Sequence, residues 1–421
     1  GLLTGAVGMA AVPMLGQMAS AATVSPPQPP VPSGPKLTLA GGRGHGVGDA
    51  RGADIAVTNA RATQGRFGLM FPDLQPFLPD DDLLVGLSKQ MVDPRPPLED
   101  VSLSADGFDN PYIPAGYTYF GQFVDHDMTR DPTPLPQQQV DPHALQNFDT
   151  PFFDLGSVYG RGPVADPQLY DPARPGVLLL SRVQGGPLDL PRAADGTAFV
   201  GDPRNDENLI IAQLQIAFLQ LHNQFLASGM SFTEAQQQTR WHYQWVIVHD
   251  YLPHIVGQDL VTQMLQPGPR GTIAVDNRFY RPGNRLRPMM PLEYSVAAYR
   301  YGHSMIRAEY EMHEGNTMPL FGPQGSDLRG SRPLPAEAWA DWNYFFELPN
   351  IEQPDDRNMT RMIDTKLSLP LANLPPSVVA HIDGAILALA ERNLLRGKRL
   401  GLPAGGLDGA QGAGLEHRPC R

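Results

Sequence analysis

The sequence predicts a mainly α-helical fold with little β structure, organised as a single domain with long Pro- and Gly-rich loops. Apolar residues recur at the spacing of a helix face in four stretches: residues 115–128, 208–227, 292–309 and 377–401. Alternation of apolar and polar residues, the pattern of strands, is hard to find. The 421 residues include 44 prolines and 43 glycines, so we expect many irregular connections between the helices.

The first predicted helix ends in the polar sequence GQFVDHDMT. Gln122, Asp125 and His126 are spaced at i, i+3 and i+4, so they share one face of the helix. Asp127 projects about 100° away from His126. Burying such a set of groups is costly without a task, so this helix is expected to line a site. The alternative is a solvated polar face.

Arg204 and Glu207 stand in the sequence GDPRNDEN, immediately before the second predicted helix. Their spacing of i, i+3 places a cation and a carboxylate on one face at the helix entrance. The alternative is that Glu207 only complements the helix dipole. His222, within the apolar helix that follows, is interpreted as a hydrogen-bonded core histidine.

The third predicted helix carries Arg300, His303 and Arg307 along one stripe. Three small residues border this stripe: Ala297, Ala298 and Gly302. A flat cofactor would fit in the room that they leave. The alternative for His303 is a core histidine that binds no metal.

The fourth predicted helix stops at Gly401, and the segments outside the helical part divide the chain further. Residues 1–22 are small and apolar and close on Ala-Ser-Ala, which predicts the remnant of a secretory signal. The alternative is a membrane anchor, against which Pro13 and Gln17 argue. The remaining boundaries are a Pro/Gly-rich linker at 23–50, the domain at 51–405 and a disordered tail at 406–421.

Net charge and cysteine content exclude several classes of function. A net charge of −12 repels phosphate backbones, which argues against a nucleic-acid partner and favours a small-molecule substrate. The single cysteine, Cys420, excludes disulfides, Cys-rich zinc sites and thioether-linked haem. Any metal must therefore be bound by His and oxygen ligands. Secretion without disulfides predicts an extracellular or periplasmic protein of a bacterium, with no stable membrane insertion after signal removal.

Six segments in a fixed order give the sequence a specific resemblance. Over roughly residues 50–405 it resembles the animal-type haem peroxidases of the peroxidase-cyclooxygenase superfamily, in particular their shorter bacterial members. The segments are YIPAGYTYFGQFVDHDMT, TPFFDLGSVYG, GDPRNDEN with LHNQF, HDYLPHIVG, AAYRYGHSMI and AERNLLRGKRLGLPAG. The family continues past GLPAG with further helices, so the domain is expected to be truncated at its C-terminal end.

The resemblance implies roles for the residues that match the family's motifs. His126 would be the distal histidine, Gln122 its hydrogen-bonding neighbour and Arg204 the distal arginine. His303 would be the proximal iron ligand, and Asn393 would accept a hydrogen bond from its ring. The cofactor implied is haem b, with peroxide and a small electron donor as partners.

Three further residues match positions that contact the haem edge in the family. Arg300 would meet a haem propionate, although a surface ion pair is the alternative. Asp125 and Glu207 would form ester links to haem methyl groups after reaction with peroxide. The alternative is that both carboxylates only form hydrogen bonds near the haem edge.

The chemistry of peroxide explains this choice of residue types. A neutral imidazole at His126 can take the proton of the near oxygen and return it to the departing oxygen, which requires a pKa below the working pH. The Arg204 cation helps to keep the imidazole neutral and stabilises negative charge on the departing oxygen. The resemblance implies a ferryl haem as the oxidising intermediate.

A calcium site is also implied by the resemblance. Its ligands would be Asp127, Thr150, Asp154 and the Phe152 carbonyl, all hard oxygen donors. Gly156 stands where the family has Ser or Asp, so one side-chain ligand is missing. The alternative is a loop without metal.

The donor and the rival functions complete the expectations. Asn208 replaces the methionine of strong chloride oxidisers, so we expect oxidation of iodide, thiocyanate, bromide or phenols.

The first rival is a fatty-acid dioxygenase of the same superfamily, whose radical tyrosine lies three residues before the proximal histidine. Arg300 occupies that position, and Tyr301 lies on another helix face. The second rival is a secreted interaction protein with a non-functional haem pocket.

Overall fold

A computed structural model describes most of the region that the sequence predicts to be helical. The described residues are 65–93, 109–130, 146–147, 150–182, 186–275, 280, 288–323, 325–379 and 385–405. The predicted signal remnant at 1–22, the linker at 23–50 and the tail at 406–421 with Cys420 lie outside them.

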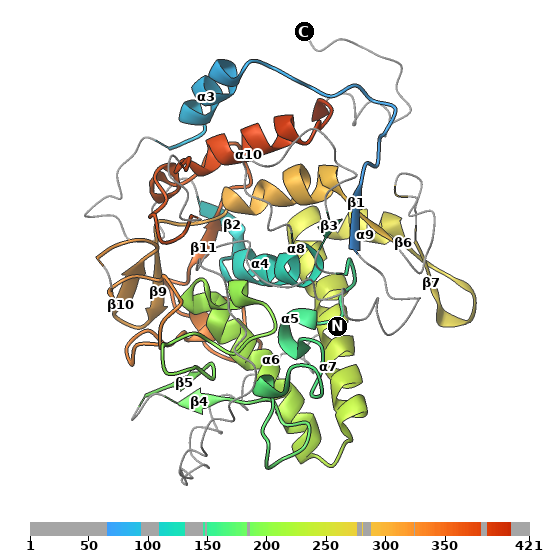
Figure 1. The fold of residues 1–421 in the computed structure, drawn as a ribbon, viewed down its shortest axis with the longest axis vertical. Helices are drawn as coiled ribbons and strands as arrows, with labels where there is room; N and C mark the ends of the chain where they lie inside the picture. The colour runs from blue at the N-terminus through green and yellow to red at the C-terminus, as the bar shows by residue number, and fades with distance from the viewer. Residues whose placement is uncertain are drawn as a thin grey trace.

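The described chain is mainly helical, as the sequence predicted (Figure 1). The α-helices are α3 (Asp81–Gln90), α4 (Gly116–Met128), α5 (Gly156–Tyr159), α6 (Leu209–Ala227), α7 (Phe232–Val246), α8 (Leu252–Val256), α9 (Gln258–Met264) and α10 (Leu389–Arg399). Single turns of other helix types also occur, of which three matter here: η4 (Pro203–Asp206), η7 (Glu293–Ala297) and η8 (Ala298–His303).

The β structure in the described residues consists of short strands of two to six residues. They are β1 (Gly65–Gly68), β2 (Asp109–Pro114), β3 (Gln146–Asn147), β4 (Ser181–Arg182), β5 (Leu188–Asp189), β6 (Leu265–Pro267), β7 (Ile273–Val275), β8 (Met289–Pro291), β9 (Glu309–His313), β10 (Asn316–Pro319) and β11 (Met359–Arg361). β1 pairs with β3 antiparallel and with β8 in parallel, and the other strands pair two by two.

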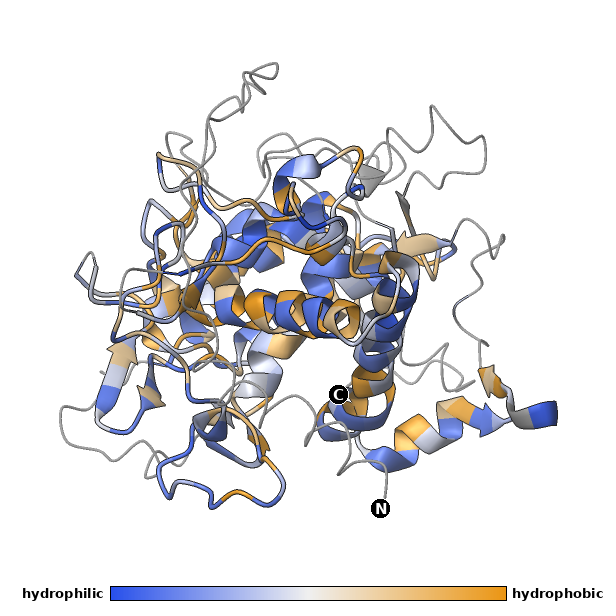
Figure 2. Cartoon of the chain, turned by 90° about the horizontal axis from the view of Figure 1, so that it is seen from below, coloured by the Kyte–Doolittle hydropathy of each residue, from blue (hydrophilic) through white to orange (hydrophobic). Residues whose placement is uncertain are grey.

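Helix α6 forms the centre of the hydrophobic core. Asn208 caps its first turn by accepting a hydrogen bond from the Ile211 amide at 2.9 Å. Phe218 in this helix stacks on Phe123 of α4, with the ring centroids 4.8 Å apart. Figure 2 shows apolar and hydrophilic residues alternating along most helices, as expected for helices with one buried face. Packing against α4 and α7 therefore fixes where α4 presents its polar residues.

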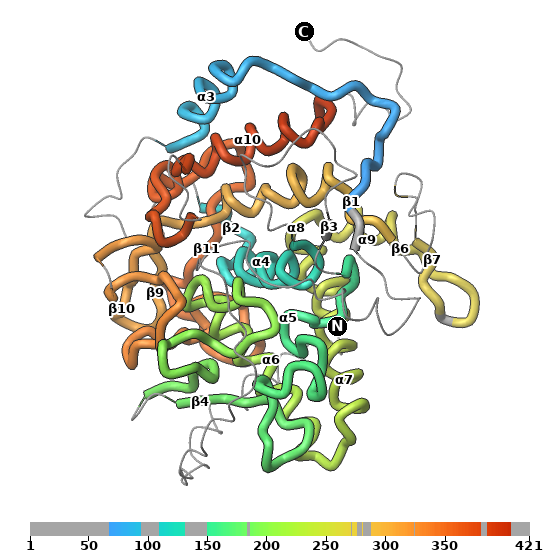
Figure 3. Tube along the Cα trace, viewed as in Figure 1, coloured from blue at the N-terminus to red at the C-terminus, as the bar shows by residue number. Residues whose placement is uncertain are grey.

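Helices packed one on another position the candidate site. α10 packs against α3 on one side and against η7 on the other, and η8 packs against α4 (Figure 1). Figure 3 shows the chain leaving β1 and running across the outside of α10 to α3. Glu293 at the start of η7 fixes the beginning of this path, because its carboxylate accepts hydrogen bonds from the amides of Met70 and Phe71 at 2.9 and 3.1 Å.

Two of the four predicted helices are confirmed almost to the residue, as α4 and α6. The prediction for 292–309 was wrong: the chain forms a π turn, η7, then a 3-10 segment, η8, which ends at His303. Ala297 and Ala298 in its middle are exposed, so no side-chain packing enforces α geometry there. Ala297 departs from helical angles, with φ −121° and ψ −75°.

The fourth predicted helix is only half present. α10 begins at Leu389 and ends before Gly401, whose φ of +67° suits a glycine at a helix end. The described residues in the first half of the predicted helix, 377–379 and 385–388, are not helical, and the Leu387 carbonyl accepts from the Leu374 amide at 3.0 Å.

Candidate active site

His126 lies in the last turn of α4 and is almost completely buried, with 1% of its surface exposed. Its Nδ1 is 2.8 Å from Oδ1 of Asn205 in η4. Its Nε2 is 3.6 Å from Oε1 of Glu207, the residue that ends η4. The two ring nitrogens therefore meet different groups: Nδ1 meets an amide and Nε2 meets a carboxylate.

Arg204 is held against α4 by the buried carboxylate of Asp202. This carboxylate caps η4 by accepting from the Arg204 amide at 2.9 Å, and it accepts from the guanidinium at 2.8 Å. The guanidinium also donates to the His126 carbonyl at 3.2 Å, and its other end lies 3.8 Å from Asp125. These pairings offset the free-energy cost of burying the cation and fix the orientation of the guanidinium.

Gln122 and Glu207 complete the predicted distal group. The Gln122 amide donates to the Glu207 carboxylate, and Asn208 donates to Oε1 of Gln122 at 3.2 Å. Asp125 accepts a hydrogen bond from the Thr129 hydroxyl at 2.9 Å. The structure thus brings together all five residues that the sequence placed on the distal side: Gln122, Asp125, His126, Arg204 and Glu207.

The surroundings of His126 lower its pKa. Burial is the main cause, because it penalises the charged imidazolium, and the Arg204 cation adds to it. The carboxylates of Glu207, Asp202 and Asp125 act in the opposite direction but do not prevail. His126 is therefore neutral at pH 7, which is the state that a general base requires.

His303 lies at the end of η8, where Asn393 of α10 contacts its ring. Nδ2 of Asn393 is 2.8 Å from Nδ1 of His303, so Asn393 donates to the ring here, whereas the resemblance implied that it accepts from the ring. Arg300 donates from Nε to the Ser295 carbonyl at 3.0 Å. The structure thus brings His303 and Asn393 together and places Arg300 on the same short segment.

The proximal segment offers space for a flat group. Ala297 and Ala298 are exposed although the residues before them are buried. A Cβ atom built on Gly302 would meet no atom of the described residues within 4 Å. An imidazole beside small residues and open space fits the side of a haem on which an axial ligand lies.

A cluster of tyrosines joins the proximal segment to α4. The Tyr251 hydroxyl lies 2.7 Å from that of Tyr301 and 3.4 Å from that of Tyr299. Tyr299 donates to the Gly121 carbonyl at 2.7 Å. Burial raises the pKa of Tyr251 to about 12, so this cluster is uncharged at neutral pH. From the sequence, Tyr301 was predicted only to lie on another helix face than Arg300, and the other members were not indicated.

The predicted calcium ligands are partly brought together. Asp154 accepts from the Thr150 hydroxyl at 2.8 Å and from the Gly156 amide at 3.0 Å. Asp127 accepts from the Leu155 amide at 3.0 Å, whereas the Phe152 side chain is exposed. Within the described ranges no group of three or more His, Cys, Asp or Glu side chains could hold a metal ion. Calcium binding therefore stays a prediction.

Three buried residues near His126 escaped the sequence analysis: Asp202, Asn205 and Gln215. Asp202 and Asn205 stand in the same motif as Arg204, so a run of polar residues before an apolar helix was the available signal. The interpretation of His222 is confirmed, since this buried ring lies 3.1 Å from both the Tyr159 hydroxyl and the Gly176 carbonyl.

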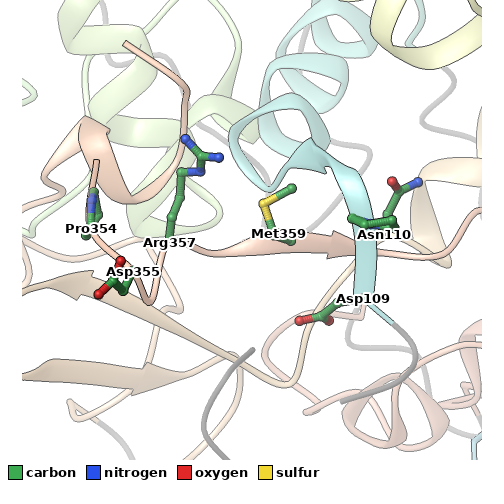
Figure 4. A pocket seen from close by; sticks show the side chains of 7 residues that line it. Asp109, Asn110, Pro354, Asp355, Arg357 and Met359 are labelled. Atoms are coloured by element: carbon green, nitrogen blue, oxygen red, sulfur yellow. The ribbon is translucent and has the colours of Figure 1, made fainter. Parts of the chain in front are cut away.

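Arg307 does not belong to the stripe of His303, contrary to the prediction, because the helix ends before it. It pairs with Asp109 at 2.6 Å and donates to the Met359 carbonyl at 3.0 Å. A shallow surface pocket lies at this place, where β2 pairs with β11 (Figure 4). Its lining includes Arg357, Asp355 and Pro354 and none of the predicted site residues.

Among the described residues, no helix combines the length and the apolar character that are needed to span a bilayer.

Comparison with solved structures shows the fold. Peroxidase A from Dictyostelium discoideum superposes with a TM-score of 0.55 and 16% identity, covering 86% of this chain and 76% of that one. A fatty acid alpha-dioxygenase from Arabidopsis thaliana gives a TM-score of 0.53 and 13% identity, covering 82% of this chain and 61% of that one. The same fold therefore serves two oxidative activities.

Comparison of sequences shows the family. A chorion peroxidase of Aedes aegypti is 30% identical over 193 residues, which make up 41% of this chain and 23% of that protein. A peroxidase-like protein of Margaritifera margaritifera is 24% identical over 281 residues, or 52% of this chain and 35% of that protein. The chain thus spans well under half of the length of either relative. The model of the animal haem peroxidase family matches residues 130–403, a range that includes Arg204, His303 and Asn393, and the chain therefore belongs to this family.

Proposed function

We propose that this chain is a haem peroxidase, an oxidoreductase that reduces hydrogen peroxide and oxidises small donors. The observation that carries the proposal is the buried His126, whose Nδ1 meets Asn205 while Arg204 is fixed beside its helix. The family binds haem in general, and a bound haem would supply iron to take up peroxide and the capacity to remove electrons from a donor.

The residues that would hold the haem lie on two segments. His303 would bind the iron through Nε2, with the Asn393 amide turned so that its oxygen, in place of its nitrogen, meets Nδ1–H of the same ring. Asn393 would keep the ring in one orientation and tune its strength as a ligand. Arg300 would meet a propionate. The exposed Ala297 and Ala298 and the open side of Gly302 support a flat group beside His303.

The distal residues would move the protons of peroxide. Nε2 of His126 would accept the proton of the oxygen nearer to the iron and return it to the departing oxygen. The lowered pKa of this imidazole supports the role, since only the neutral ring can accept a proton. The Arg204 guanidinium would stabilise negative charge on the departing oxygen, and burial strengthens this effect by excluding water.

Finer features of the proposal rest on single residues. Asp125 and Glu207 would form ester links to haem, which their position at the distal group and their partial exposure support. Asp127, Thr150 and Asp154 would bind calcium, with Ser157 or water in place of the ligand missing at Gly156. Asn208 supports iodide, thiocyanate, bromide or phenols as donors rather than chloride. A secreted, extracellular or periplasmic location follows from residues 1–22.

A fatty-acid dioxygenase is the second candidate, favoured by the likeness to the Arabidopsis thaliana enzyme. The position three residues before His303, where the dioxygenases that the sequence resembles carry a radical tyrosine, is Arg300. Tyr301 lies close by, but its hydroxyl contacts Tyr251. Peroxidase activity is therefore the better supported of the two.

The test compares rates of reaction with peroxide in the haem-loaded protein. Stopped-flow mixing with hydrogen peroxide should give rates for His126→Ala and Arg204→Leu that are lower by about 10²- to 10⁴-fold. Gln213→Leu, on α6 but bonded to the Leu209 and Ala338 carbonyls, is the matched control and should react like the wild type. Equal rates in all variants, or oxygen uptake with a fatty acid and no phenol oxidation, would contradict the proposal.

A further inference from the structure

We propose that Asn205 and Gln215 are positioning residues that fix which ring nitrogen of His126 carries the proton. Asn205 would accept a hydrogen bond from Nδ1–H, so that Nε2 presents its lone pair. The inference about the tautomer stands on geometry alone, and only its consequence for peroxide rests on the proposed function. Neither residue was indicated by the sequence.

The direction of the hydrogen bonds is set at the far end, by a backbone carbonyl. Nε2 of Gln215 is 3.3 Å from the Ser157 carbonyl, which can only accept a hydrogen bond. The NH2 group of Gln215 must therefore face Ser157, and its Oε1 must face Asn205. Nδ2 of Asn205 lies 2.8 Å from this oxygen and donates to it.

The same argument carries through to the imidazole. Because Nδ2 of Asn205 is used by Gln215, its Oδ1 is the atom that meets Nδ1 of His126, at 2.8 Å. An amide oxygen accepts but cannot donate, so the proton must be on Nδ1. In the neutral ring, Nε2 is then the nitrogen that can accept a proton.

The reverse orientation of the two side-chain amides would bring oxygen atoms into contact with each other. Turning the Asn205 amide would place its oxygen against Oε1 of Gln215, and turning Gln215 as well would place an oxygen against the Ser157 carbonyl. All four residues are buried, with exposed fractions of 1% or less, so water is poorly placed to compensate. The hydrogen bonds of the series therefore all run in one direction: His126 in α4 donates to Asn205 in η4, Asn205 donates to Gln215 in α6, and Gln215 donates to Ser157 in α5.

The consequence lies at the other ring nitrogen. Nε2 faces Glu207 at 3.6 Å, on the side where the distal residues gather. The opposite tautomer would direct an N–H there and turn its lone pair to Asn205, and it could not take a proton from peroxide. Asn205 and Gln215 would thus hold the base ready without touching the substrate.

The first test reads the tautomer directly, without any measurement of activity. The full chain is labelled with ¹⁵N-histidine, expressed without added haem, and studied by long-range ¹H–¹⁵N correlation at neutral pH. The signals of His126 are identified by their loss in His126→Gln. We expect Nδ1 to give the shift of a protonated nitrogen and Nε2 that of an unprotonated one. The reverse pattern, or a mixture of both, would overturn the inference.

Variants of the series provide the second test. Asn205→Leu and Gln215→Leu should yield a mixture of tautomers. Gln213→Leu, two residues from Gln215 on α6, should leave the wild-type pattern unchanged. If Asn205→Leu fails to fold, the wild-type spectrum and Gln215→Leu still decide.

The peroxide reaction separates this inference from the proposed function. In the haem-loaded protein at one pH, Asn205→Leu should react more slowly by about tenfold or more, whereas Gln213→Leu should react like the wild type. The expected tautomer without any reaction of the wild type would uphold the inference and contradict the proposed function. Normal reaction with the proton on Nε2 would do the opposite.

Discussion

His126 and His303 lie in surroundings that differ in burial and in backbone order. His126 ends a regular helix, is 1% exposed, and meets residues that are themselves held by buried hydrogen bonds. His303 ends a 3-10 segment that follows a π turn, is partly exposed, and borders exposed alanines. Among the described residues, side chains surround His126, whereas the segment of His303 leaves space at Gly302 and exposes Ala297 and Ala298.

This difference teaches what each region contributes. His126 and Arg204 keep their positions because each is bonded to a buried group, His126 to Asn205 and Arg204 to Asp202. Among the described residues, such packing is lacking at Ala297, Ala298 and Gly302, so a bound flat group would become part of the core there. Under the proposed function, haem would therefore support the structure of the proximal segment and react on the side of His126.

Haem retention should show the largest difference between the surroundings of His303 and those of His126. His303→Ala should abolish retention of haem, because it removes the proposed iron ligand from a segment with little other support. His126→Ala, the matched variant on the distal side, should retain the wild-type haem content and lose only reactivity with peroxide. Absorbance spectra and haem content after gel filtration measure both. Equal retention in the two variants would show that His303 is not the ligand.

Unfolding free energies should show the next largest effect. Asp202→Ala leaves the buried Arg204 cation without its main partner, which should destabilise the protein by about 3–5 kcal/mol. Arg300→Leu removes one hydrogen bond to a backbone carbonyl in the partly exposed proximal segment, at a cost of about 1 kcal/mol. Chemical denaturation of both variants without added haem measures the difference. Similar losses in the two would remove the contrast in packing.

The smallest expected effect is a shift in pH dependence. The pKa of His126 is lowered, so the neutral base persists below the usual range for histidine, and the rate with peroxide falls only as the pH drops through this lowered pKa. Glu207 raises this pKa, and Glu207→Gln should therefore move the acid limb to still lower pH. Peroxide reaction rates from pH 4 to 8 test the shift. A move to higher pH would contradict the assignment of the limb to His126.

The sequence predicted those parts of the molecule whose structure is local. The helices at α4 and α6 follow from apolar spacing, and the distal residues follow from two motifs. The Asn205–Gln215 contact could not be predicted, because it depends on how η4 turns back on α6. The prediction of an α-helix in the proximal segment was wrong for another reason: the small residues of this segment permit an α-helix but do not enforce one.

The carboxylate of Glu293 has a consequence for the order in which the chain acquires its structure. It bonds to the Met70 and Phe71 amides, 223 and 222 residues away, and β1 pairs with β8 beside it, whereas His126 and Asn205 are only 79 residues apart. Closing a longer loop costs more entropy, and contacts between distant residues form slowly. During vectorial synthesis, therefore, the residues around His126 can assemble as soon as α6 has emerged, while the segment of His303 must wait for α10 and for the return of the first strand.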